Sequence, residues 1–227
     1  MLKKIFASLI LAAGLCSAVS LAAVNYTFSD VNSDTDYQAA IYWAADRGIA
    51  TGYGNGMWGP DECVRRAELM KMVMEFNGTP IATKTDSVSK FSDVLRTDWF
   101  YTYVTLANSY GYIDGYADGT FKPNACVNRA EAMKIAVNVL IEKNPTSWPT
   151  TGLFYDDKLI VDMDPGSWYI PYAYRLFKDR LVGTNHTISA GYVGGLPTIK
   201  FFPDESMTRA EVAEMLYRIN QYLVARQ

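Results

Sequence analysis

"FSDVLRTDWFYTYVTLANSYGYIDGYADGTFKPNACVNRAE", residues 91–131, is the stretch that decides the fold, because the chain contains it more than once. A shift that brings Phe28 onto Phe91 aligns it without a gap with "FSDVNSDTDYQAAIYWAADRGIATGYGNGMWGPDECVRRAE", residues 28–68. Self-similarity at a fixed spacing is the signature of repeat architectures. The sequence therefore predicts tandem copies of one structural unit.

A third copy opens at Phe154, which follows Phe91 at the same spacing as Phe91 follows Phe28. Its Arg209 lies farther beyond Phe154 than Arg129 lies beyond Phe91, so the third copy contains added residues. About six of them fall before Trp168 and about eleven within 185–200, and we interpret both as loop expansions on an otherwise conventional repeat.

Each copy predicts a helix, a glycine-rich turn and a second helix. Apolar residues recur at helical spacing after the opening Phe-x-Asp, and an aromatic residue stands two positions before a proline in the turn. The second helix starts at an Arg-Ala-Glu triplet, and Thr208 and Glu211 form a capping box there in the third copy. Asn128 can cap in the same way, whereas Arg65 cannot. The apolar stripes of these helices predict a mainly α fold with a three-helix core. The three units span residues 26–80, 89–145 and 152–224.

Residues 1–22 have the features of a secretory signal peptide. Two lysines precede an eleven-residue apolar segment, and Ser20-Leu21-Ala22 supplies a small-x-small cleavage site. We expect cleavage after Ala22 and export of the mature chain. We expect no membrane insertion afterwards, since the apolar segment is shorter than the ~20 residues of a span. The large Leu15 before Cys16 argues against a lipoprotein.

Composition disfavours several function classes. The net charge of −3 lacks the basic excess of a nucleic-acid binder. The single histidine, His186, has no paired ligand, and the acidic run 30–36 lacks the glycine and glutamate of a calcium loop. We therefore expect no metal and no cofactor. Without a nucleophile–base pair or paired-acid motif, we also expect no enzymatic activity.

The ordered elements Phe-x-Asp-Val, Gly-Ile-x-x-Gly, Asp-Gly-x-Phe-x-Pro and Thr-Arg-Ala-Glu resemble the S-layer homology (SLH) domain in three tandem copies, over roughly residues 26–224. The resemblance implies a pseudo-threefold, three-pronged bundle with the Arg-Ala-Glu helices at its centre. It also implies non-covalent attachment to the cell wall, with a secondary wall polysaccharide, often pyruvylated, held in grooves between repeats.

A second hypothesis is a structural or assembly protein of the cell envelope. The chain carries 16 Tyr, 10 Phe and 5 Trp, and an aromatic surface of this kind can mediate contacts with S-layer or other envelope proteins. The glycan sites would then be vestigial. Sedimentation with purified cell walls separates the two hypotheses.

The three triplet arginines are the main candidates for ligand contact. A cation in the first turn opposes the helix dipole, so Arg66, Arg129 and Arg209 call for a partner. From the residues alone, an anionic ligand at the helix start and an ion pair with a nearby aspartate fit equally well. The resemblance favours the glycan. We interpret the triplet glutamates as helix caps.

Six further residues complete the predicted glycan site: Trp99, Trp168, Asp93, Asp156, Gly52 and Gly115. Flat aromatic rings can stack on sugars, with core packing as the alternative use, and glycine admits a close ligand or a tight turn. We expect the groove using Arg129 and Trp99 to be strongest, and Arg129→Ala to leave folding nearly intact. Asp36 replaces the tryptophan in the first copy and Thr184 the glycine in the third, which puts their grooves in doubt.

Cys63 and Cys126 occupy equivalent positions in the first two copies, where the third copy has Ser206. Export permits a disulfide between them, and threefold-related positions near adjacent core helices could bring their Cα atoms within the required ~4.4–6.8 Å. The alternative is two buried thiols.

Overall fold

The computed structural model describes residues 27–79, 88–141, 145, 153–155, 157–182 and 188–226. The predicted signal peptide, residues 1–22, lies outside this part of the chain, as do Asp156, Thr184 and His186. The first helices of the three units are α1 (Gln38–Asp46), α3 (Tyr101–Ser109) and α5 (Ile170–Lys178). The second helices are α2 (Arg66–Phe76), α4 (Arg129–Leu140) and α6 (Arg209–Val224).

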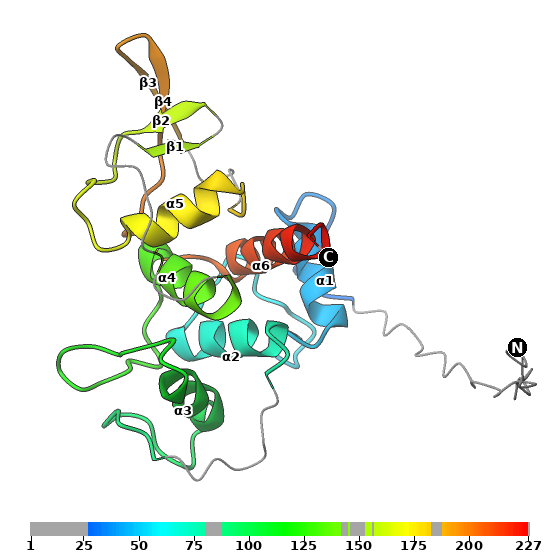
Figure 1. The fold of residues 1–227 in the computed structure, drawn as a ribbon. Helices are drawn as coiled ribbons and strands as arrows, with labels where there is room; N and C mark the ends of the chain where they lie inside the picture. The colour runs from blue at the N-terminus through cyan, green and yellow to red at the C-terminus, as the bar shows by residue number, and fades with distance from the viewer. Residues whose placement is uncertain are drawn as a thin grey trace, which may run out of the picture.

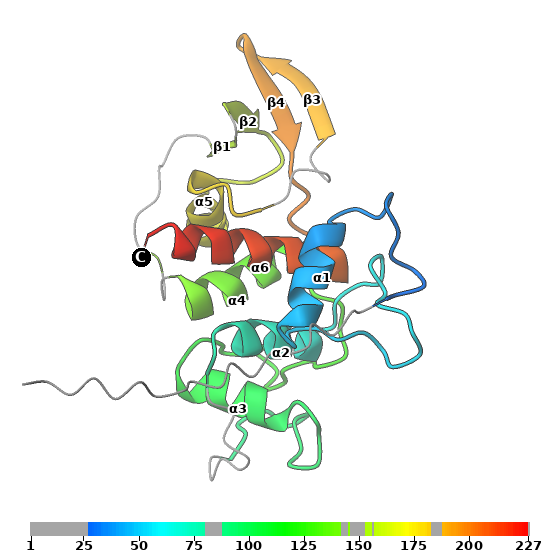
Figure 2. The same ribbon diagram turned by 90° about the vertical axis from the view of Figure 1, so that its right-hand side faces the viewer.

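The three second helices form the centre of the molecule. Helices α2, α4 and α6 lie next to one another in both views (Figures 1 and 2) and contact one another pairwise. Each first helix packs on the second helix of the preceding unit: α3 on α2, α5 on α4 and, closing the circle, α1 on α6. The predicted mainly α, three-pronged bundle is confirmed. Within the described residues, no helix combines the length and hydrophobicity that a membrane span needs.

Capping residues start the central helices, as the sequence predicts. Asn128 accepts a hydrogen bond from the backbone amide of Glu131, and Thr208 accepts one from that of Glu211. Each glutamate reaches back to the amide of its capping residue, and Glu68 does the same for Arg65 at 2.9 Å. The glutamates therefore use one carboxylate oxygen for capping.

A cyclic set of backbone hydrogen bonds relates the three units. The amide of Val64 donates to the carbonyl of Met207, that of Val127 to Val64, and that of Met207 to Val127. The amide of Arg66 donates to the carbonyl of Ala125, and its two equivalents make the same bond to the next unit around the ring. Because carbonyls of a neighbouring unit already accept from these first-turn amides, the amides themselves are not free to bind an anion.

The two insertions of the third unit form a small sheet, which corrects the prediction of loop expansions. Its strands are β1 (Leu153–Tyr155), β2 (Lys158–Ile160), β3 (Ile188–Val193) and β4 (Leu196–Lys200), in the order β1-β2-β4-β3. Strands β2 and β4 pair in parallel, which joins the two insertions, and the other pairs are antiparallel. The sheet projects beyond α5 (Figure 1). Each insertion supplies its own hairpin, and the β2–β4 pairing that joins the hairpins links segments far apart in sequence.

The cysteines lie at the junction of the first two units. The structure joins Cys63 to Cys126 with Cα atoms 5.6 Å apart, inside the range that a disulfide requires. The same ring of contacts brings Ser206 opposite Asn128 at the next junction. The geometry favours the bridge over two thiols.

Candidate functional site

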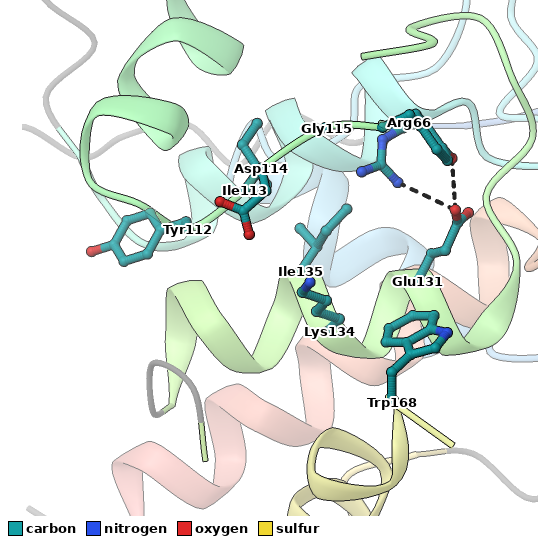
Figure 3. A pocket seen from close by; sticks show the side chains of 10 residues that line it. Arg66, Tyr112, Ile113, Asp114, Gly115, Glu131, Lys134, Ile135 and Trp168 are labelled. Atoms are coloured by element: carbon teal, nitrogen blue, oxygen red, sulfur yellow. Dashed lines mark hydrogen bonds and ion pairs between the residues drawn. The ribbon is translucent and has the colours of Figure 1, made fainter. Parts of the chain in front are cut away.

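Two grooves of similar construction open between the units. Groove A is about 180 Å³ and is lined by residues 112–116, Arg66, Glu131, Lys134, Ile135 and Trp168 (Figure 3). Groove B is about 210 Å³ and is lined by residues 49–53, Glu68, Lys71, Met72, Trp99 and Arg209. Each takes its turn and second helix from one unit, its tryptophan from the next unit and its arginine from the third. Side chains far apart in sequence therefore meet at equivalent sites.

The two tryptophans lie on the surface of these grooves. Trp99 is 58% exposed and Trp168 is 53% exposed, which excludes the alternative of core packing. Each indole ring packs edge-to-face against the ring of the next residue, Phe100 or Tyr169. This contact supports the indole in one orientation. An exposed, supported indole beside a polar groove is suited to stacking on a flat apolar surface such as a sugar face.

Each groove also contains a lysine that was not predicted from the sequence. Lys71 and Lys134 line grooves B and A, each five residues after the triplet arginine of its own helix. The Nζ atom of Lys134 lies 5.6 Å from the ring centroid of Trp168. At this position in the third unit stands Glu214, which accepts a hydrogen bond from Arg218 at 2.6 Å. The common five-residue offset was the signal that could have found the lysines.

The triplet arginines are buried and form a cyclic set of ion pairs. Arg66, Arg129 and Arg209 are 7%, 4% and 5% exposed. Each pairs with the triplet glutamate of the following unit: Arg66 with Glu131 at 3.8 Å, Arg129 with Glu211 at 2.6 Å and Arg209 with Glu68 at 3.5 Å. The ion-pair alternative holds for all three, with glutamate in place of aspartate. The burial and pairing of Arg129 contradict the expectation that Arg129→Ala leaves folding nearly intact.

Arg66 differs from the other two in its unused hydrogen-bond donors. Its Nε and Nη1 atoms are buried without a hydrogen-bond partner. The Arg66 side chain lines groove A (Figure 3). Arg129 donates to the carbonyls of Phe201 and Phe202 as well as to Glu211. Arg209 donates to the carbonyl of Trp58. Buried donors are normally satisfied, so those of Arg66 need a partner.

The predicted pairing of Arg129 with Trp99 in the strongest groove is wrong. Trp99 lines groove B together with Arg209, and Trp168 lines groove A together with Arg66. Arg129 instead borders a space of about 20 Å³, whose lining includes Tyr37 and Met215. The error arose because the tryptophan and arginine of one unit belong to different grooves.

The opening aspartates are structural, and the third one was misassigned. The carboxylate of Asp93 accepts hydrogen bonds from the amides of Phe121 and Lys122, both at 2.8 Å, and so ties the turn to the start of the unit. In the third unit Asp162 makes the equivalent bonds to the turn at Phe201. Asp162 therefore stands in the third unit where Asp93 stands in the second, whereas Asp156 lies outside the described residues. The β1–β2 hairpin precedes it and imitates the Phe-x-Asp opening.

The two predicted glycines border the grooves, but their own packing explains them. Gly52 and Gly115 have φ values of +81° and +78°. A Cβ atom on Gly52 would lie 2.7 Å from the carbonyl oxygen of Met57, and one on Gly115 would lie 2.2 Å from the ring of Phe91. Both positions therefore require glycine whether or not a ligand approaches.

Tyrosines on the groove walls remain protonated donors. Burial, followed by a hydrogen bond to Glu131, raises the pKa of Tyr116 to about 12. The hydroxyl of Tyr116 donates to Oε1 of Glu131 at 2.6 Å. Burial also raises the pKa of Tyr53, whose ring lies 4.5 Å from the guanidinium of Arg209 in groove B. The two grooves therefore combine protonated phenols, cations and an exposed indole.

Comparison with known proteins supports the predicted family resemblance for the first two units. Residues 27–70 and 90–133 match the S-layer homology domain family. The chain is 33% identical over 108 residues to the middle cell wall protein of Brevibacillus brevis, 31% over 144 residues to a surface layer protein of Brevibacillus choshinensis and 31% over 121 residues to a cellulosome-anchoring protein of Acetivibrio thermocellus. These alignments cover 47%, 61% and 52% of this chain.

The chain spans only 10%, 13% and 27% of the length of these relatives. The similarity supports an exported, cell-surface location. The S-layer homology matches thus fall one in each of the first two units.

Proposed function

We propose that this chain attaches to the cell wall by binding an anionic, pyruvylated secondary wall polysaccharide in grooves A and B. The observation that carries the proposal is groove A, where buried guanidinium donors of Arg66 without hydrogen-bond partners lie beside Lys134 and the exposed Trp168. Cationic donors suit the carboxylate of a pyruvyl ketal, and the indole suits the sugar ring that carries it.

The proposal includes the third unit and the leader segment. Residues 152–224 are a divergent third S-layer homology repeat in this proposal, because α5 and α6 repeat the helix–turn–helix order and close the cyclic bonds around the core. Residues 1–22 are a signal peptide. Binding involves no cofactor, and the third unit contributes Trp168 to groove A and Arg209 to groove B.

Sedimentation with purified cell-wall sacculi tests the proposal. The wild-type protein is expected to sediment with them, Trp168→Ala and Trp99→Ala are each expected to weaken binding about tenfold, and the double variant is expected to abolish it. Tyr192→Ala is the matched control, because this exposed aromatic side chain lies on β3, outside both grooves. Undiminished sedimentation of the double variant would remove both grooves from wall binding.

An assembly protein of the envelope is the second candidate function. The sheet of the third unit favours it, because the side chains of Tyr192, Val193 and Leu196 are exposed around the β3–β4 turn. Exposed apolar side chains grouped in this way are typical of protein contacts. In that case Tyr192→Ala would impair assembly, the tryptophan variants would not, and the protein would not sediment with sacculi stripped of protein.

A further inference from the structure

We propose that Tyr116 is a positioning residue that keeps Arg66 available to the ligand by occupying the carboxylate that would otherwise hold the guanidinium. This inference rests on the proposed function and assigns the primary anion subsite to groove A. It follows from a difference between grooves A and B that their similar lining residues conceal.

The first observation is the arrangement around Glu131. Its Oε1 atom accepts the hydroxyl of Tyr116 at 2.6 Å, while the Nη1 atom of Arg66 lies 3.8 Å from the same oxygen (Figure 3). The other carboxylate oxygen faces the amide of Asn128 at 3.4 Å. The tyrosine thus makes the short bond to Oε1, and the arginine is left with a long ion pair.

The triplet arginines of the other two units are held more closely. Arg129 pairs with Glu211 at 2.6 Å and Arg209 with Glu68 at 3.5 Å, and both also donate to backbone carbonyls. Tyr53 corresponds to Tyr116 in groove B, but its ring lies against the guanidinium of Arg209 at 4.5 Å instead of bonding the glutamate. Only Arg66, among the described triplet arginines, has buried donors without hydrogen-bond partners.

The physical consequence concerns what an incoming carboxylate must displace. A guanidinium whose donors already bond to a carboxylate or to backbone carbonyls gains little from a second anion, whereas unsatisfied buried donors gain a full charge-assisted pair. The ring centroids of Tyr116 and Phe121 also lie 4.9 and 5.1 Å from the guanidinium carbon of Arg66. These rings limit the orientations that the guanidinium can take. Arg66 is therefore oriented and unsatisfied before the ligand arrives.

Removal of the hydroxyl tests this directly. In a Trp99→Ala background that silences groove B, calorimetry measures binding of a synthetic hexoside with a 4,6-pyruvyl ketal and of its neutral methyl ester. Tyr116→Phe frees Glu131 to hold Arg66, so affinity for the acid is expected to fall about tenfold. Affinity for the ester is expected to change less than twofold, because the ester carries no charge for Arg66 to bind.

A second variant separates positioning from a simple structural role. Glu131→Gln removes the charge that competes for Arg66 and keeps an oxygen for the helix cap. Adding it to Tyr116→Phe is therefore expected to restore affinity for the acid to within about threefold of the background protein. If the double variant stays weak, Tyr116 acts by touching the sugar or supporting the turn, and the inference is overturned.

Tyr103→Phe is the matched control. The hydroxyl of Tyr103 also donates to a glutamate, Glu75, at 2.5 Å, but this pair lines neither groove. Affinity for both probes is expected to stay at the background value. Unchanged acid binding in Tyr116→Phe would overturn the positioning role and leave the proposed function standing. If the wild-type protein bound neither probe, the proposed function would fail, and this inference with it.

Discussion

The Arg-Ala-Glu triplet starts both α2 and α4, yet Arg66 borders a groove of about 180 Å³ and Arg129 a space of about 20 Å³. The triplet itself does not decide whether a groove opens. At the positions that correspond to the tryptophan and the lysine of the open grooves, the first unit has Asp36 and the third has Glu214. A groove needs suitable residues from all three units, whereas the triplet serves the core in each of them.

Backbone conformation contributes to the same difference. Tyr37 starts α1 with a left-handed φ of 60°, whereas the corresponding Phe100 and Tyr169 have φ values of −90° and −87°. Tyr37 lines the small space beside Arg129, while the side chains of Phe100 and Tyr169 are buried under their tryptophans. The first unit therefore brings its aromatic residue into the place that a ligand would need.

The largest expected effect is on stability and distinguishes the two arginines. Arg129→Ala removes three hydrogen bonds of a buried guanidinium, among them its ion pair with Glu211, which we expect to lower the free energy of unfolding by about 3–5 kcal/mol. Arg66→Ala removes a longer ion pair and is expected to cost markedly less while weakening ligand binding. Urea unfolding measures both, and equal losses would contradict the division into a structural and a ligand-binding arginine.

The disulfide is the next largest effect and tests the junction that frames groove A. Cys63 and Cys126 are 63 residues apart, and a cross-link over a loop of that length contributes about 2–4 kcal/mol, mainly by constraining the unfolded chain. Cys63→Ser with Cys126→Ser is expected to lower stability by that amount without changing binding in groove B. Thiol titration of the unfolded, unreduced wild-type protein checks the bridge, and two free thiols would refute it.

A smaller effect separates the two open grooves. Asp114 in groove A corresponds to Thr51 in groove B, so groove A carries one more carboxylate opposite its cations (Figure 3). Asp114 is exposed, and a charge in that setting changes affinity for an anion by only about two- to threefold. Asp114→Thr is expected to strengthen acid binding in groove A, and Thr51→Asp to weaken it in groove B. Added salt should diminish both differences, and calorimetry with each groove silenced in turn measures them.

Sequence reasoning recovered what depends on local pattern within one unit. The helix caps at Asn128 and Thr208, the glycine turns and the three-helix core follow from spacing and residue type. It failed where the answer depends on which units are neighbours, because a repeat offset does not say whose tryptophan faces whose arginine. The pairing of Trp99 with Arg209 and the joining of two insertions into one sheet are both of this kind.

One failure was avoidable from the sequence. Asp93 precedes Trp99 by six residues, and Asp162 precedes Trp168 by the same number, whereas Asp156 stands twelve residues before it. The tryptophan was a better reference point than the Phe-x-Asp pattern, which the β1–β2 hairpin happens to reproduce. Hydrogen bonds from the turn amides to Asp162 are the physical reason for the constant spacing, since the aspartate must reach the turn from a fixed position before the first helix.

The last prediction is that a variant gains no binding. It tests whether the small space beside Arg129 fails to bind a ligand for a reason other than its missing tryptophan and lysine. With both open grooves silenced by Trp99→Ala and Trp168→Ala, Asp36→Trp and Glu214→Lys restore the aromatic ring and the cation that the third site lacks. We expect no binding of the pyruvylated hexoside by calorimetry, because Tyr37 and Met215 still line a space of about 20 Å³, smaller than one sugar ring, and Arg129 remains bound to Glu211 at 2.6 Å. Thermal unfolding checks that the variant is folded. Measurable binding would mean that residue type alone decides which of the three sites bind a ligand. The absence of binding would mean that the backbone conformation at Tyr37 and the ion pair of Arg129 with Glu211 keep the third site closed.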